Sequence, residues 1–134
     1  MMHLVLLAAT LLLAQAPAAP VTLPDTPAGR GLKEFVASFN AGGAERRTWV
    51  TSRTTMPAES AESILEQDAA ILEQHGAFTV VRVATATDTV ITAIMRHAKS
   101  GAHAHFMLEA SAEAPFKVTN MQLRAATPDE IAGK

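Results

Sequence analysis

The chain has 134 residues, a formal net charge of −2, one tryptophan, no tyrosine and no cysteine. This near-neutral balance gives no electrostatic basis for binding nucleic acid or an anionic membrane, and so few large aromatic side chains argue against base stacking. The lack of cysteine excludes disulfide bonds, thiolate metal sites and a lipid anchor on cysteine.

An apolar block at the N-terminus predicts an exported bacterial protein, either periplasmic or secreted. Residues 4–13 are followed by Ala14-Gln15-Ala16, the small-x-small pattern that signal peptidase cleaves. The block is too short to span a bilayer, which takes about 20 apolar residues. We therefore expect residues 1–16 to be a signal peptide, with no stable membrane span after cleavage. An uncleaved anchor or a wrongly assigned start is the alternative.

The segment after the signal peptide is predicted to be a linker over residues 17–29. Four prolines fall among its first eleven residues, a density that disfavours both helix and central strand and favours an extended chain. A folded domain is expected over 30–126, followed by a frayed tail over 127–134.

The first predicted helix covers 31–40. Its apolar residues fall at positions i, i+3, i+4 and i+7, which form one face of a helix: Leu32, Phe35, Val36 and Phe39. The Gly42-Gly43 pair then predicts the end of the helix.

A second, shorter helix is predicted over 44–51. Trp49 and Val50 provide its apolar contact with the core. Arg46 and Arg47 are expected on its solvated face.

The longest predicted helix covers 57–75, with Pro57 in its first turn and Gly76 at its end. Its apolar arc consists of Ile64, Leu65, Ile71 and Leu72. Asp68 and His75 fall in the middle of this arc, two turns apart. This placement is unusual because an unpaired buried carboxylate costs several kcal/mol.

From residue 78 the apolar period changes to two, which predicts strands. We expect four of them, over 78–84, 89–97, 102–110 and 115–124. Their short connections predict antiparallel pairing, and helices followed by such a sheet indicate an α+β fold. A β-bulge near Thr119-Asn120 would place four apolar side chains of the last strand on one face and bend it: Phe116, Val118, Met121 and Leu123.

Three histidines surround the turn between the second and third strands. A three-residue loop, Lys99-Ser100-Gly101, would place His97 opposite His103, with His105 diagonal on the same face. This register would bring the three histidines close enough to form a candidate metal site.

A two-residue loop at the same turn gives the other register. His103 and His105 would then share a face with Arg96, and His97 would turn to the opposite face. The three-residue loop is favoured, because Ser-Gly is a weaker two-residue turn than Asn-Gly.

Four phrases of the sequence carry a family resemblance: LKEFVASFNAG, EQHGAF, FTVVRVA and PFKVTNMQLRAATP. They resemble the small NTF2-like domain, in the version found ahead of, or fused to, bacterial secreted serine-hydrolase and peptidase modules. The likeness spans residues 30–128, and we expect a stand-alone copy. It implies a cone, with N-terminal helices packed on a curved four-stranded antiparallel sheet and a pocket at the open end. Gly43 departs from the pattern, because such domains usually carry an acidic residue there, and no catalytic residue is carried over.

The first functional hypothesis is a non-catalytic module that binds a small apolar molecule or dimerises. The expected pocket is lined by Phe35, Phe39, Asp68, Leu72, His75, Ile94 and Phe106. Apolar residues on both strand faces also predict a homodimer through the sheet. They are Val90, Ile94, Phe106 and Leu108 on one face and Ile91, Met95 and Met107 on the other. No cofactor is expected.

The alternative is a small cofactor-free enzyme of the isomerase or hydratase type. Asp68 would be its general base and His75 a polar partner, since a carboxylate held against apolar surface can transfer protons. If Asp68 and His75 are structural residues instead, Asp68 pairs with an arginine such as Arg53 or Arg82, and His75 caps the last helical turn.

Overall fold

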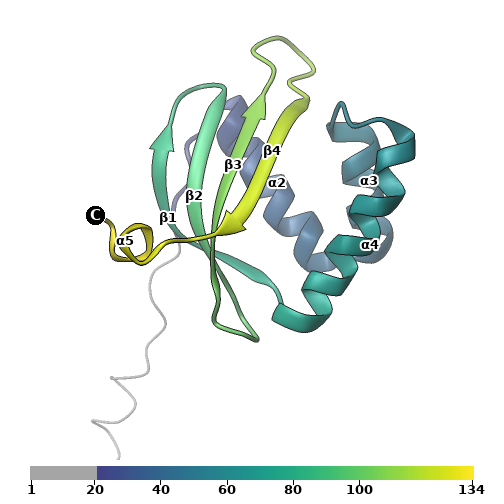
Figure 1. Cartoon of the computed structure of the whole chain (residues 1–134). Helices are drawn as coiled ribbons and strands as arrows, with labels where there is room; N and C mark the ends of the chain where they lie inside the picture. The colour runs from purple at the N-terminus through teal and green to yellow at the C-terminus, as the bar shows by residue number, and fades with distance from the viewer. Residues whose placement is uncertain (1–20) are drawn as a thin grey trace, which may run out of the picture.

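Helices come first and strands second in the computed structural model, which describes residues 21–134. The predicted signal peptide, residues 1–16, lies outside this range. Figure 1 shows α2 lying behind the sheet, with α3 and α4 to one side of it. The three helices are α2 (Pro27–Ala41), α3 (Gly43–Arg53) and α4 (Ala58–His75). The predicted α+β class is confirmed.

The first helix begins earlier than predicted, inside the segment assigned to the linker. Thr26 caps it, because its side-chain oxygen accepts a hydrogen bond from the Gly29 amide at 3.0 Å. Pro27 occupies the first helical position, where its missing N–H and fixed φ are tolerated. Ala28 is then fully buried. Pro27, one of the prolines that predict the linker, is therefore the first residue of a helix.

The strands form one open, curled antiparallel sheet in the order β1-β2-β3-β4. Their bounds are β1 Phe78–Ala86, β2 Val90–His97, β3 His103–Ala110 and β4 Val118–Ala125. The predicted bulge is confirmed: Asn120 pairs with Glu109 and Val118 with Ala110, which leaves Thr119 extra. Val118 and Met121 therefore both pack on the core. Leu123 shares this face as predicted, because it pairs with the inner-facing Phe106, although its side chain is 40% exposed. Phe116 differs, because it lies before the strand.

The predicted register of the β2–β3 hairpin is wrong. Arg96 pairs with His103, and the His97 amide donates to the Ala102 carbonyl at 2.9 Å, so the loop contains four residues, Ala98 to Gly101. The end of α4 fixes this loop, because the Lys99 and Ser100 amides donate to the His75 carbonyl at 2.8 and 3.2 Å.

The parity of the register decides which strand residues face the helices. A shift of one residue moves every side chain to the other face. The inner face carries Ile91, Met95, Phe106 and Leu108, whereas Ile94, His103 and His105 lie on the outer face. The predicted grouping of Ile94 with Phe106 is therefore wrong.

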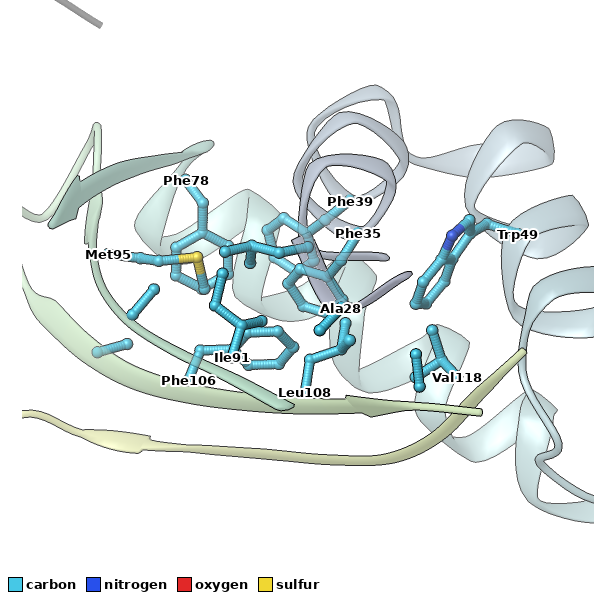
Figure 2. Packing of buried hydrophobic residues seen from close by; sticks show 14 of the residues in the cluster. Ala28, Phe35, Phe39, Trp49, Phe78, Ile91, Met95, Phe106, Leu108 and Val118 are labelled. Carbon is cyan, nitrogen blue, oxygen red and sulfur yellow. The ribbon is translucent and has the colours of Figure 1, made fainter. Parts of the chain in front are cut away.

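Aromatic rings fill the space between α2 and the sheet, as Figure 2 shows. Phe35 stacks on Phe106 with ring centroids 4.2 Å apart, and Phe39 meets Phe78 at 4.7 Å. The Trp49 ring approaches Phe35 edge-on at 5.8 Å. All five rings are buried, so this part of the cone is a packed core.

The predicted frayed tail contains a short capped helix, α5 (Pro128–Ala132). Thr127 and Glu130 form a capping box at its start. Glu130 bonds to side chains on three strands, which places α5 on the outer face of the sheet. Within residues 21–134, no helix is long and apolar enough to cross a membrane.

Candidate functional site

A pocket of about 340 Å³ lies where the end of α2 meets α3 and α4. Apolar side chains from α2 and α4 form its walls, and charged side chains from α3 and α4 stand among them. The lining residues include Phe39, Gly42, Arg46, Leu65, Asp68, Ala69 and Leu72. Its volume is in the range of sites that take small molecules.

Arg46 is buried beside this pocket, and the prediction that it lies on a solvated face is wrong. Only 4% of its side chain is exposed. Nε donates to Oδ2 of Asp68 at 2.8 Å, and Nη1 donates to Oγ of Ser38 at 2.9 Å. Its guanidinium carbon also lies 4.4 Å from the Phe35 ring centroid. Arg47, in contrast, is exposed as predicted and pairs with Glu62.

The environment of Arg46 has two opposite effects on the pKa of its guanidinium group. Burial lowers the pKa of the guanidinium, and the charge of Asp68 together with its hydrogen bond raises it. Arginine stays protonated in either case, since its ordinary pKa is above about 12. The site therefore contains a buried ion pair that joins α3 to α4.

The ion pair leaves one atom on each partner unused. Within residues 21–134, the hydrogen bonds of Arg46 use Nε and Nη1, and Asp68 accepts through Oδ2. No fully buried side-chain nitrogen or oxygen in this part of the chain lacks a partner, so Nη2 of Arg46 and Oδ1 of Asp68 are not fully buried. Both residues line the pocket.

The structure separates the seven residues predicted to line a pocket. Phe39, Asp68 and Leu72 line the pocket between the helices. Phe35 and Phe106 are stacked in the buried core. The remaining two, Ile94 and His75, lie on the outer face of the sheet and beside the hairpin loop.

Asp68 and His75 have different partners and are not joined to each other. Asp68 pairs with Arg46, whereas Nδ1 of His75 lies 3.0 Å from Oγ of Ser100. The expectation that Asp68 pairs with an arginine is thus confirmed, but neither Arg53 nor Arg82 is that partner. Their guanidinium groups bond to Glu34 and to the Glu130 carbonyl.

The three hairpin histidines do not converge. His97 is buried on the inner face, where Nδ1 donates to the Gly76 carbonyl at 3.0 Å, while His103 and His105 lie on the outer face. Within residues 21–134 no three or more His, Asp or Glu side chains are grouped to hold a metal ion. The loop has four residues and not two or three. His97 nevertheless lies on the face opposite to His103 and His105, as the alternative two-residue loop predicts.

Sequence reasoning missed the role of Arg46, yet a signal for it exists. Arg46, Trp49 and Val50 stand at i, i+3 and i+4, so an α-helix places all three on one face. Trp49 and Val50 are apolar and buried, and Arg46 is buried as well because it lies on the same face of the helix. Arg47 is rotated off this face by about 100°.

No protein-family model matches the chain, and comparisons with curated proteins and with solved structures returned no match. The fold and the site define a class in structural terms. It is an α+β protein with N-terminal helices on one face of an open, curled antiparallel sheet and a pocket between those helices.

Proposed function

We propose that the protein is an exported, non-catalytic NTF2-like module that binds a small, mainly apolar molecule in the pocket between α2, α3 and α4. The observation that carries this proposal is the pair of unbonded atoms, Nη2 of Arg46 and Oδ1 of Asp68, on two residues that line a pocket together with apolar side chains. Phe39, Leu65 and Leu72 offer the apolar contact. A pocket with few polar groups on apolar walls is the common form of a small-molecule site.

The pair of unused atoms selects the polar group of the ligand. Nη2 of Arg46 can only donate a hydrogen bond, and the carboxylate oxygen Oδ1 of Asp68 can only accept one. A neutral group that accepts and donates at once, such as a primary carboxamide, satisfies both. A carboxylate satisfies Arg46 but is repelled by Asp68, so we expect neutral amides to bind more tightly than the matching acids.

The family and export parts of the proposal have separate support. The order of elements, the curled sheet and the packing of α2 on its inner face agree with the cone that the NTF2-like resemblance implies. Export is supported by the apolar block at 4–13 and the Ala14-Gln15-Ala16 pattern. The homodimer through the sheet remains a prediction, which sedimentation of the purified protein tests.

Two tryptophan variants on α4 test the pocket. Ala69 is exposed and lines the pocket, so Ala69→Trp should fill it without disturbing the core. Ala70 is also exposed and does not line it, which makes Ala70→Trp the matched control. Benzamide, benzoate and toluene serve as probes in ligand-observed NMR and calorimetry.

The proposal expects benzamide to bind the wild-type protein and the Ala70→Trp variant, and to bind the Ala69→Trp variant at least ten-fold more weakly. Benzoate should bind more weakly than benzamide. Equal binding by the two tryptophan variants would place the ligand elsewhere. If neither benzamide nor toluene binds the wild-type protein, the binding function is overturned.

Export is tested on the protein expressed from its full sequence in a bacterial host. We expect the protein outside the cytoplasm, with a mature N-terminus at Pro17. Cytoplasmic protein that retains residues 1–16 would contradict this part of the proposal, and it would leave the pocket experiment unaffected.

A further inference from the structure

The outer face of the sheet carries a row of basic side chains from neighbouring strands. Arg82 pairs with Ile94, Ile94 with His105, and His105 with Arg124, so these four residues cross the sheet from β1 to β4. Directly paired residues of antiparallel strands point to the same face, with side chains about 5 Å apart. The row therefore offers three basic groups around one apolar residue.

One carboxylate of the chain already occupies this row. Both Oε atoms of Glu130 accept hydrogen bonds from Arg124, at 2.7 and 2.8 Å. Oε2 also lies 3.5 Å from Nε2 of His105, and the Glu130 carbonyl accepts from Arg82. A two-pronged arginine–carboxylate pair of this kind is geometrically specific.

The basic surface extends beyond what Glu130 neutralises. Arg96 and His103 form the next cross-strand pair on the same face. Within the described residues, Arg96 is exposed and its side chain makes no hydrogen bond or ion pair. Three arginines and two histidines thus share one end of the outer face, although the whole chain has a net charge of −2. The three arginines outnumber the one carboxylate of Glu130, which suits a second negatively charged group next to the first.

The helix that supplies Glu130 is short and contains no buried residue. α5 spans only Pro128–Ala132 and has no buried residue, and Ile131 is 42% exposed. Its attachment includes the polar bonds of Glu130, whose Arg124 partner is 52% exposed, and Ile94 in the middle of the row is itself only 1% exposed. Segments with little buried apolar surface open at low free-energy cost.

We propose that Arg82, Arg96, His103, His105 and Arg124 form a docking surface for an acidic segment of a partner protein, and that α5 occupies part of it as an intramolecular substitute. The occupant seen in the structure defines the ligand chemistry, which is a carboxylate on a short capped turn. The adjacent Arg96 adds a position for a second acidic side chain. The surface lies on the opposite side of the sheet from the pocket between the helices, so the two proposals are independent.

The test uses the full chain and a copy of its own occupant. The probe is a blocked peptide with the sequence ATPDEIAGK, residues 126–134, and its control has glutamine in place of the glutamate. Glu130→Ala should empty the carboxylate position. Asp129→Ala is the matched control, because this neighbouring acid makes no side-chain bond to the described strands. Binding is measured by calorimetry and by NMR shifts of the His103 and His105 rings.

We expect the peptide to bind the Glu130→Ala variant at least ten-fold more tightly than the wild-type protein or the Asp129→Ala variant. Adding Arg124→Ala to Glu130→Ala should abolish that gain, and the glutamine peptide should bind at least ten-fold more weakly. Equal binding to wild-type and Glu130→Ala proteins overturns the proposal. So does binding of inorganic phosphate to the emptied surface without binding of the peptide.

Discussion

Nε of Arg46 lies 2.8 Å from Oδ2 of Asp68, and this ion pair joins α3 to α4 at the wall of the pocket. The two side chains are 4% and 16% exposed, so neither is fully solvated. Three partners hold the guanidinium, since it also donates to Ser38 and to the Phe35 carbonyl. The pair is therefore part of the packed structure as well as of the candidate site.

Removal of Asp68 should destabilise the fold. Asp68→Ala leaves the buried guanidinium of Arg46 without its counter-charge, and we expect the free energy of unfolding to fall by about 3 kcal/mol. Urea denaturation measures this. Glu66→Ala is the matched control, because Glu66 is an exposed acid on the same helix, and it should change stability by no more than about 0.5 kcal/mol. An Asp68→Ala protein more stable than wild type would show that the ion pair lowers the stability of the fold.

Glu130 should titrate far below an ordinary glutamate. Hydrogen bonds from Arg124, with a further bond from the Thr127 amide, lower the pKa of its carboxyl from 4.5 to about 2. Because the folded pKa is depressed, the contribution of this carboxylate is fully present above pH 4.5 and is lost as the pH falls through about 2. Carboxyl-carbon NMR measures the titration. Arg124→Gln should move the midpoint upward, and an unchanged midpoint would contradict the assigned cause.

Two glycine variants should separate steric overlap from backbone strain. Gly76 ends α4 at φ +86°, and a Cβ there would lie 2.7 Å from the Lys99 amide nitrogen. Gly101 has φ +72° and open space around it. Gly101→Ala should cost about 1 kcal/mol from the positive φ alone, and Gly76→Ala at least about 1 kcal/mol more. Equal losses in thermal or urea unfolding would mean that the hairpin loop is not packed on the end of α4.

His97 should carry its proton on Nδ1 when neutral. The Gly76 carbonyl can only accept, so the 3.0 Å contact requires a donor on the ring. Nitrogen NMR distinguishes the two tautomers. His97→Leu leaves the carbonyl without this donor and should cost about 1–3 kcal/mol, whereas His103→Leu on the outer face should cost less. A ring protonated on Nε2 alone would contradict the contact.

The patterns of apolar residues predicted the elements well because they depend on local geometry. Helical spacing placed Phe35 and Phe39 on the buried face of α2, and alternation placed four strands in the correct order. The change of parity in the last strand predicted the bulge at Thr119, since apolar residues on both parities of one strand require an extra residue to share a face.

The candidate site was predicted in part. Phe39, Asp68 and Leu72 do line a pocket, because all three belong to inward faces of predicted helices. The choice of arginine for Asp68 depends on how α3 packs against α4, a contact between residues 22 positions apart. Phe35 and Phe106 were expected to line a cavity, but their stacking fills that space.

Local sequence patterns were sufficient to predict the α+β class, the antiparallel order of the strands and the bulge in β4, because each follows from periods and turn lengths within short segments. The hairpin register, the burial of Arg46 and the docking of α5 depend instead on contacts between segments that are distant in the chain. The register depends on bonds from the Lys99 and Ser100 amides to the His75 carbonyl at the end of α4. One residue of shift at that loop separates His97 from His103 and His105, and it places His105 where Glu130 can reach it.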